Sequence, residues 1–229
     1  MQPGLNPRLQ TVADLVVSGR RVVDVGTDHG ILAAWLYLRG VSDQITACDI
    51  NEKPLVNAAK TFAQYGLTGK IGLVRSDGLA ALPAGQQEVV IAGMGGELIA
   101  RILTAGVDRL SPDAGLVLQP MTHHEDLRVC LAGLGFVIRA ETLVEDEGRL
   151  YLVLRAEPGD AAAPDDLTAF VGRFTDAADP LTRRYLTGRR AYAAARADGL
   201  RAENDPAAAR FEALVRALDA LLAKKEETS

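Results

Sequence analysis

The fold is decided by the sequence RVVDVGTDHGI, which occupies residues 21–31. Residues 21–25 are rich in valine, a pattern typical of a strand buried on both faces. Gly26 follows at once and allows the backbone to bend tightly at the end of the strand. The apolar run after this turn predicts a helix over residues 31–39. A buried strand, a glycine turn and a helix indicate the first unit of an open α/β sheet, with a ligand bound at the turn.

The alternation of short apolar runs and helix-like stretches continues to residue 156. It predicts further strands at 44–49, 70–74, 88–92, 115–119, 136–144 and 150–155, and helices at 53–65, 97–105 and 124–134. Only residues 145–149 separate the last two strands, too few for a crossover helix, so these strands should pair antiparallel. A parallel, Rossmann-like α/β sheet that ends in an antiparallel hairpin is typical of class I methyltransferases rather than of nicotinamide dehydrogenases.

The composition changes after residue 157 and predicts two domains, residues 1–157 and 158–229. The segment 158–166 (PGDAAAPDD) has the composition of a linker. Beyond it, Leu181, Tyr185 and Tyr192 share one face of a first helix. A second helix is expected to begin at Asp205–Pro206, with aspartate as the N-cap and proline at the first helical position. Neither helix buries its apolar stripe alone, so an antiparallel, coiled-coil-like helical hairpin is predicted.

The totals for the 229 residues exclude several classes of protein. The formal net charge of −5 gives no overall basic field for nucleic acid, so any RNA contact must come from a local cluster of cations. Cys48 and Cys130 lack the spacing of metal ligands, which excludes structural zinc and fits a reducing compartment. No apolar run approaches the roughly 18 residues of a membrane span, and no signal sequence is recognisable. We therefore expect a cytoplasmic protein.

Acidic residues follow three successive predicted strands. Asp24 closes the first strand, Asp49 the second and Asp77 the third. The first turn lacks the full glycine pattern of a dinucleotide site, and Asp28 would repel a pyrophosphate. A ligand with an ammonium and a sulfonium group would instead favour carboxylates, and Asp49 could accept both ribose hydroxyls of an adenosine. Capping of the following helices remains an alternative role for these acids.

A glycine-rich run, IAGMGG, ends the fourth predicted strand at residues 91–96. Gly93, Gly95 and Gly96 clear side chains from the backbone beside the expected cofactor, so a planar base could enter there. The alternative is a flexible turn into the next helix.

These motifs resemble those of a known family. The runs DVGTDH (24–29), RSDG (75–78), IAGMGG (91–96) and LQP (118–120) resemble bacterial tRNA adenine-22 N1-methyltransferases over roughly residues 5–156. The resemblance implies transfer of a methyl group from S-adenosylmethionine to N1 of an adenine in the D-arm region of tRNA. It also implies that the protein needs no metal and is a monomer or weak homodimer.

The residues and the resemblance together give three sets of expected site residues. The catalytic set is Asp28, His29 and Gln119. The cofactor set is Asp24, Gly26, Asp49, Ile50, Asp77, Gly78 and Gly93. The RNA set is Met94, Gly95, Gly96, Arg8, Arg183 and Arg190.

This chain departs from the family pattern at two places. Gly30-Ile31 stands where the family has Ala-Tyr, and Met121 stands where the family has Asn after Gln-Pro. The chain also lacks the Asn/Asp-Pro-Pro-aromatic loop with which many amino-group methyltransferases hold the target nitrogen, so Gln119 is the expected amide beside the target base.

The first C-terminal helix carries the strongest cluster of cations in an acidic chain. On a helical wheel, Arg183, Arg190 and Arg201 lie opposite the apolar stripe, so we expect them to point outward and to meet a phosphate backbone. An ordinary solvated face is the alternative. Two other functions remain open: a class I methyltransferase acting on a small molecule or protein, and a non-catalytic RNA-binding protein with a relic Rossmann fold.

Overall fold

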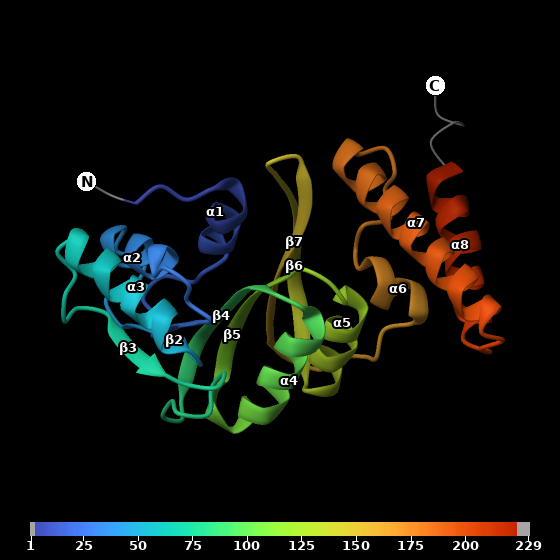
Figure 1. Cartoon of the computed structure of the whole chain (residues 1–229). Helices are drawn as coiled ribbons and strands as arrows, with labels where there is room; N and C mark the ends of the chain where they lie inside the picture. Colours follow the sequence, from blue (N-terminus) through green and yellow to red (C-terminus); the bar gives the residue numbers. More distant parts are fainter. Residues whose placement is uncertain (1–2, 224–229) are drawn as a thin grey trace. The chain divides into compact units, whose positions relative to one another are not determined.

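The structure is a computed structural model that describes residues 3–223 (Figure 1). Its contacts divide the chain into two units, residues 1–163 and 164–229. The division falls in the Ala/Pro/Asp-rich segment that the sequence indicates as a linker. Within the described residues, no helix combines the length and the apolar character that crossing a membrane requires.

The first unit is built on one seven-stranded sheet in the order β3-β2-β1-β4-β5-β7-β6. The strands are β1 (Val22–Val25), β2 (Ile45–Asp49), β3 (Gly72–Arg75), β4 (Gln86–Met94), β5 (Leu110–Pro120), β6 (Phe136–Asp146) and β7 (Arg149–Pro158). The first five are parallel, and β7 pairs antiparallel with both β5 and β6. The prediction of a parallel sheet with a terminal antiparallel hairpin is therefore confirmed. Every residue of β1 is buried, as its valines predict.

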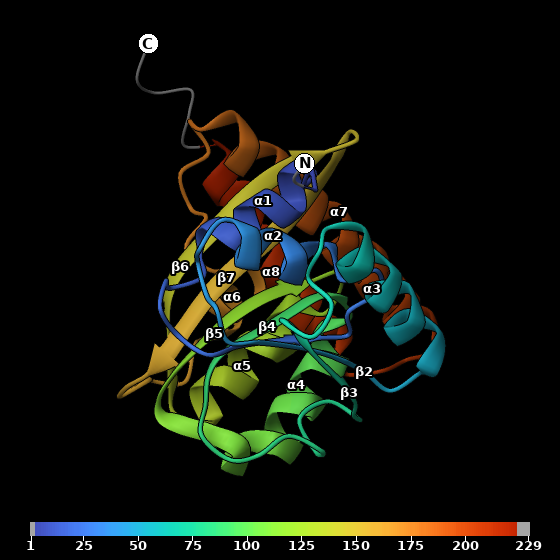
Figure 2. The ribbon, with the colours of Figure 1, turned by 90° about the vertical axis from the view of Figure 1, so that its left-hand side faces the viewer.

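Helices cover both faces of this sheet. They are α1 (Pro7–Asp14), α2 (Ile31–Leu38), α3 (Glu52–Gln64), α4 (Gly96–Gly106) and α5 (His124–Gly133). Helices α1, α2 and α3 lie on one face and α4 and α5 on the other (Figure 2). Helix α1 was not predicted from the sequence. Its start nevertheless carries a recognisable signal, because Asn6 is the N-cap and accepts a hydrogen bond from the backbone N–H of Leu9, and Pro7 occupies the first helical position.

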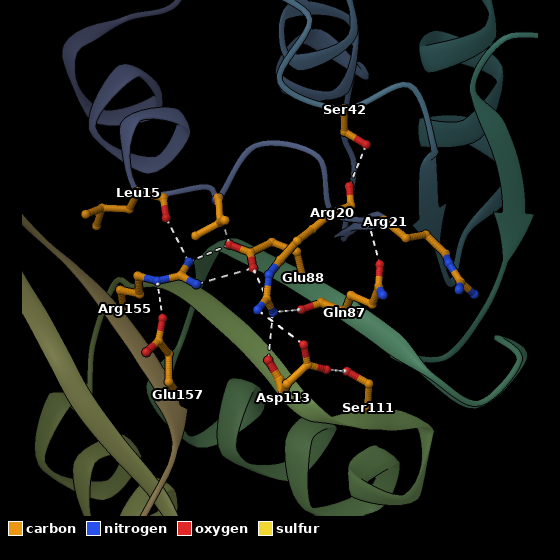
Figure 3. A network of polar contacts seen from close by, with 11 residues as sticks. Leu15, Arg20, Arg21, Ser42, Gln87, Glu88, Ser111, Asp113, Arg155 and Glu157 are labelled. Carbon is orange, nitrogen blue, oxygen red and sulfur yellow. Dashed lines mark hydrogen bonds and ion pairs between the residues drawn. The ribbon is translucent and has the colours of Figure 1, made fainter.

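A buried ion pair joins the start of β4 to the carboxyl-terminal part of β7 (Figure 3). Glu88 on β4 is 0% exposed and accepts hydrogen bonds from Arg155 on β7 and from the backbone N–H of Val17. Arg155 also donates to the carbonyl of Leu15 at 2.8 Å and to Glu157 at 3.0 Å. These contacts satisfy both charges away from water and tie the segment after α1 to the sheet.

The second unit contains three helices, α6 (Asp166–Val171), α7 (Pro180–Ala202) and α8 (Ala208–Ala223), of which α7 and α8 pack together as the predicted pair. Helix α6 was not predicted, because it lies at the end of a segment with the composition of a linker. Helix α8 begins two residues after Pro206, the expected first helical position, since residues 206–207 form a turn.

The apolar stripe predicted for α7 was partly wrong. Tyr185 and Leu186 are buried, together with the small residues Ala193 and Ala197. Tyr192 is 39% exposed. Small side chains let α7 and α8 approach closely, so the buried face follows the alanines rather than the aromatic ring.

Candidate functional site

A cavity of about 410 Å³ lies at the carboxyl edge of the parallel strands. Its walls come from α1, from the turn after β1, and from the ends of β2 and β4. The lining residues are Arg8, Leu9, Asp24, Gly26, Thr27, Asp28, His29, Gly30, Ile31, Leu32, Asp49, Ala92, Gly93 and Met94. Ligands of drug size occupy cavities of roughly 300–1,000 Å³, so this cavity can hold a nucleoside with a side chain.

Asp24 places a carboxylate deep in this cavity. It is 6% exposed, and no cationic side chain of residues 3–223 lies within ion-pair distance of it. Burial raises the pKa of Asp24 from 3.8 to about 6. A buried carboxylate without a protein cation is costly and is therefore suited to a cationic group of a ligand.

The turn after β1 forms the floor of the cavity. Gly26 has a φ of +77°, and a Cβ there would overlap the Cε methyl of Met94. A Cβ at Gly30 would lie 2.7 Å from the ring of Phe62. Glycine is required at both positions, for backbone conformation and for close packing.

Asp28 and His29 lie at the mouth of the cavity. Their side chains are 78% and 59% exposed, and His29 Nε2 is 3.4 Å from the Asp28 carboxylate. Neither side chain caps α2, whose N-cap is Gly30. Both are therefore accessible to a substrate.

Asp49 lines the cavity from the end of β2. Its Oδ1 accepts a hydrogen bond from the backbone N–H of Asn51 at 2.7 Å, which fixes the carboxylate beside the cavity. The neighbouring Ile50 is 51% exposed and offers an apolar surface. This pair is suited to a ribose and the base attached to it.

Asp77 and Gly78 do not line this cavity. Asp77 lines a separate cavity of about 210 Å³ together with Arg101. A Cβ at Gly78 would lie 2.8 Å from Ile102 Cγ2, so this glycine allows the chain to pack against α4. Of the three acids expected to face one crevice, Asp24 and Asp49 line the larger cavity and Asp77 lines the smaller one.

The glycines of residues 93–96 have different roles. Gly93 is exposed, has a φ of +77° and lines the cavity beside Met94. Gly96 is buried, and a Cβ there would overlap the carbonyl oxygen of His123 and lie 2.7 Å from that of Thr122. Its role is thus to let α4 pack against the backbone of residues 122–123. Of the three glycines, Gly93 is the one that lines the cavity.

Gln119 was expected to contact the target base, but its amide is occupied within the protein. The side chain is completely buried. Its Oε1 accepts from Arg8 Nη1 at 2.6 Å and from the Gly93 N–H at 3.0 Å, and its Nε2 donates to the Pro120 carbonyl at 3.0 Å. Gln119 therefore positions Arg8 and the glycine loop from behind. The position of Gln119 at the end of a predicted strand does not indicate that its side chain is buried.

Arg8 is the cation that α1 brings to the cavity. Its guanidinium lies 5.6 Å from the centre of the Tyr151 ring and is hydrogen bonded to Gln119. Arg8 was expected among the RNA-contacting residues, and in the structure it lines the same cavity as Asp24.

The arginines of α7 do not point freely outward as expected. Arg183 donates to the carbonyl oxygens of Ala177 and Leu222, and Arg190 forms a two-armed pair with Asp219 at 2.8 and 3.2 Å. Arg201 pairs with Asp198 and Glu212. A helical wheel of α7 alone cannot show these contacts, because most of the partners lie on α8.

A small cluster of polar side chains lies where α4 and α5 begin. His123 Nδ1 is 3.3 Å from a carboxylate oxygen of Glu97 and 3.2 Å from one of Asp126. These contacts link the loop that follows β5 to the first turns of both helices.

Comparison with known proteins decides the family. Residues 5–154, which contain the whole cavity, match the model of a methyltransferase domain. The tRNA (adenine(22)-N(1))-methyltransferase of Bacillus subtilis is 36% identical over 163 residues, which cover 71% of this chain and 68% of the relative. This chain belongs to the tRNA (adenine(22)-N(1))-methyltransferase family.

Solved structures of this family share the fold over almost the whole chain. The B. subtilis m1A22 tRNA methyltransferase TrmK superposes with a TM-score of 0.85 at 27% identity, covering 96% of this chain and 100% of TrmK. The Streptococcus pneumoniae protein Sp1610 in complex with S-adenosyl-L-methionine superposes with a TM-score of 0.80 at 29% identity, covering 94% and 98% of the two chains. The family fold thus includes the helices of the second unit.

Proposed function

We propose that this chain transfers a methyl group from S-adenosylmethionine to N1 of adenine 22 in tRNA. The observation that carries the proposal is the 36% identity to the B. subtilis enzyme over 163 residues. The cavity supports this proposal, because its volume is sufficient for S-adenosylmethionine and its acidic residues suit the cationic groups of this cofactor.

The residues of the cavity fit the groups of S-adenosylmethionine. Asp49 is placed to accept hydrogen bonds from the ribose hydroxyls, and Ile50 to contact the adenine. Asp24, buried without a protein cation, is suited to the ammonium group of the methionine part. Ile50, Asp77 and Gly78 follow β2 and β3 at the carboxyl edge of the sheet, and they remain in the proposed cofactor set.

Methyl transfer to N1 depends on positioning rather than on a general base. S-adenosylmethionine carries its methyl group on a positively charged sulfur. The lone pair of N1 would attack the methyl carbon in line while the bond from carbon to sulfur breaks, and neutral S-adenosylhomocysteine would leave, so no proton has to be removed first. The positive charge that arrives on the adenine is stabilised by an acceptor for its exocyclic amine. We assign that acceptor to Asp28, with His29 holding the carboxylate at the mouth of the cavity.

The target base enters beside the glycine loop. Gly93 presents only backbone to the cavity there, and Met94 offers an apolar side chain. An adenine whose N1 is paired or stacked must first be extruded, at a cost of a few kcal/mol. Gln119 contributes by fixing the Gly93 N–H rather than by touching the base.

The second unit is the proposed tRNA contact. Asp219 engages Nε and Nη2 of Arg190, which leaves Nη1 for a phosphate oxygen. Such contacts make binding depend on salt concentration. We further propose a cytoplasmic monomer or weak homodimer that needs no metal.

The deciding experiment is methylation of unmodified tRNA transcripts with labelled cofactor, followed by identification of the modified nucleoside by mass spectrometry. The matched control is a transcript with another base at position 22. We expect 1-methyladenosine in the first transcript and none in the second. Label on a small molecule or a protein, with none on tRNA, would favour the rival methyltransferases. Failure to bind cofactor at all would favour a relic fold.

A further inference from the structure

Met121 is an exposed apolar side chain at the carboxyl edge of the sheet. It directly follows β5 and is 43% exposed. Single exposed apolar residues are common on protein surfaces and need no explanation by themselves. Met121 differs from them because both its backbone and its side chain are tied to the wall of the cavity.

Two hydrogen bonds fix the position of Met121. Its backbone N–H donates to the carbonyl oxygen of Met94 at 2.8 Å, and Met94 lines the cavity. Its Sδ accepts a hydrogen bond from Gln119 Nε2 at 3.4 Å. The other end of the same amide, Oε1, accepts from Arg8 and from the Gly93 N–H. Met121 and Arg8 therefore contact the two ends of one buried amide, next to the glycine loop.

The antiparallel pairing of β5 with β7 brings Tyr151 to the same place. Leu118 is opposite Leu154 in register, and continuing this register by three residues places Met121 opposite Tyr151. The Arg8 guanidinium lies over the Tyr151 ring at 5.6 Å, so this ring faces α1. The side chains of Met121, Tyr151 and Arg8 thus gather beside the glycine loop, at the rim of the cavity.

We infer that Met121 contacts the face of the target adenine when the base enters beside the glycine loop. This inference deepens the proposed function and rests on it, because it assumes that adenine 22 enters the cavity. A methionine side chain is flexible and polarisable, and its sulfur makes favourable contacts with aromatic rings. A base that passes Gly93 crosses the rim, and Met121 covers a part of the base that would otherwise stay in water.

A purely structural role of Met121 is the alternative, because its sulfur accepts from Gln119. The same Nε2 also donates to the Pro120 carbonyl oxygen at 3.0 Å, which is the stronger acceptor. A thioether is a weak acceptor, so the loss of the sulfur costs Gln119 little. The contact therefore orients Met121 more than it satisfies Gln119.

The test measures tRNA binding on the full chain by filter binding, with S-adenosylhomocysteine present. Two transcripts are compared, one with adenine at position 22 and one with an abasic site there. We expect Met121→Ala to weaken binding of the adenine transcript by about tenfold. Binding of the abasic transcript should stay within about twofold, because the partner of the side chain is already missing. Calorimetry should show an unchanged affinity for S-adenosylhomocysteine.

Two further variants separate the contact with the base from other effects. Met121→Leu keeps the size and the apolar character but removes the sulfur acceptor, and it should stay within about threefold of the unmodified chain for both transcripts. Val107→Ala is the matched control, because Val107 is 41% exposed and precedes the start of β5 at the other edge of the sheet. It should leave both affinities unchanged.

The outcomes are distinct. Equal weakening of both transcripts by Met121→Ala, or no weakening of either, would overturn the contact with the base. A loss with Met121→Leu as large as with Met121→Ala would assign the effect to the hydrogen bond with Gln119 and would also overturn it. Either result leaves the proposed function intact as long as the unmodified chain methylates the adenine transcript. If the unmodified chain neither methylates that transcript nor binds it better than the abasic one, the proposed function and this inference fail together.

Discussion

Replacing Glu88 by glutamine removes one charge of the buried pair with Arg155 while keeping the shape of the side chain. Glu88 is 0% exposed and Arg155 is 7% exposed, so water cannot replace the lost partner. Breaking a buried ion pair from one side costs about 3–5 kcal/mol of unfolding free energy. Arg155 keeps its bonds to the Leu15 carbonyl and to Glu157, which places the expected loss near the lower end, about 3 kcal/mol.

The fluorescence of Trp35 gives a direct assay of this loss. Trp35 is the single tryptophan of the chain and packs against the core of the first unit, so its emission reports on that unit alone. For a unit of this size about 3 kcal/mol lowers Tm by roughly 6–12 °C. Urea titration should show the same loss in free energy with an unchanged slope.

Asp108→Asn is the matched control. It also turns a carboxylate into an amide, but the pair of Asp108 with Arg109 is 3.6 Å long and largely exposed. Exposed pairs contribute little, so this variant should change the unfolding free energy by less than about 0.5 kcal/mol. If Glu88→Gln changes stability no more than Asp108→Asn does, the buried pair does not stabilise the sheet as argued.

Three further predictions concern the site. Since burial raises the pKa of Asp24 from 3.8 to about 6, the stability that this group contributes is complete below pH 3.8 and is lost as the pH rises through 6. In urea titrations of the ligand-free protein, Asp24→Asn should therefore raise the unfolding free energy at pH 8 by up to about 3 kcal/mol more than it does at pH 4. Calorimetry of the unmodified chain should detect an S-adenosylhomocysteine affinity that rises with pH, and Asp24→Asn should abolish this rise. Gly96→Ala places a methyl group against the backbone of His123, so it should lower methyl transfer to tRNA more than cofactor binding; equal losses in kinetics and calorimetry would contradict this. Asp219→Asn releases Arg190 and should tighten tRNA binding in filter-binding assays. Arg190→Gln should weaken tRNA binding and reduce the slope of log affinity against log salt concentration by about one. If both variants weaken tRNA binding, the role of the pair is structural.

The main sheet was predictable from sequence because its strands are short apolar runs separated by helices, and burial on both faces leaves this pattern. Helix α1 was not predicted, since eight residues with few apolar positions give a weak periodic signal, although Asn6-Pro7 marks its start. The same reason applies to α6, which has six residues. Short helices of this kind depend on tertiary contacts, which a local pattern does not contain.

The candidate site was predictable where a residue's role follows from its place at the end of a strand. Asp24 and Asp49 are such residues, and both line the cavity. Gln119 and Asp77 also end strands, yet the first is buried behind Arg8 and the second faces another cavity. Their surroundings come from α1 and α4, elements far away in the sequence.

The two buried carboxylates of adjacent strands show how one sheet separates stability from function. On β4, Glu88 pairs in register with Val22 of β1, and two residues further along β1 stands Asp24. Arg155 balances the charge of Glu88 at the amino-terminal edge, whereas Asp24 at the carboxyl edge has no cation within ion-pair distance among the described residues. An unbalanced buried charge lowers the stability of the free protein, and a cationic ligand restores it. At one edge of the sheet a buried carboxylate therefore stabilises the fold, and at the other edge a buried carboxylate favours binding of the cofactor.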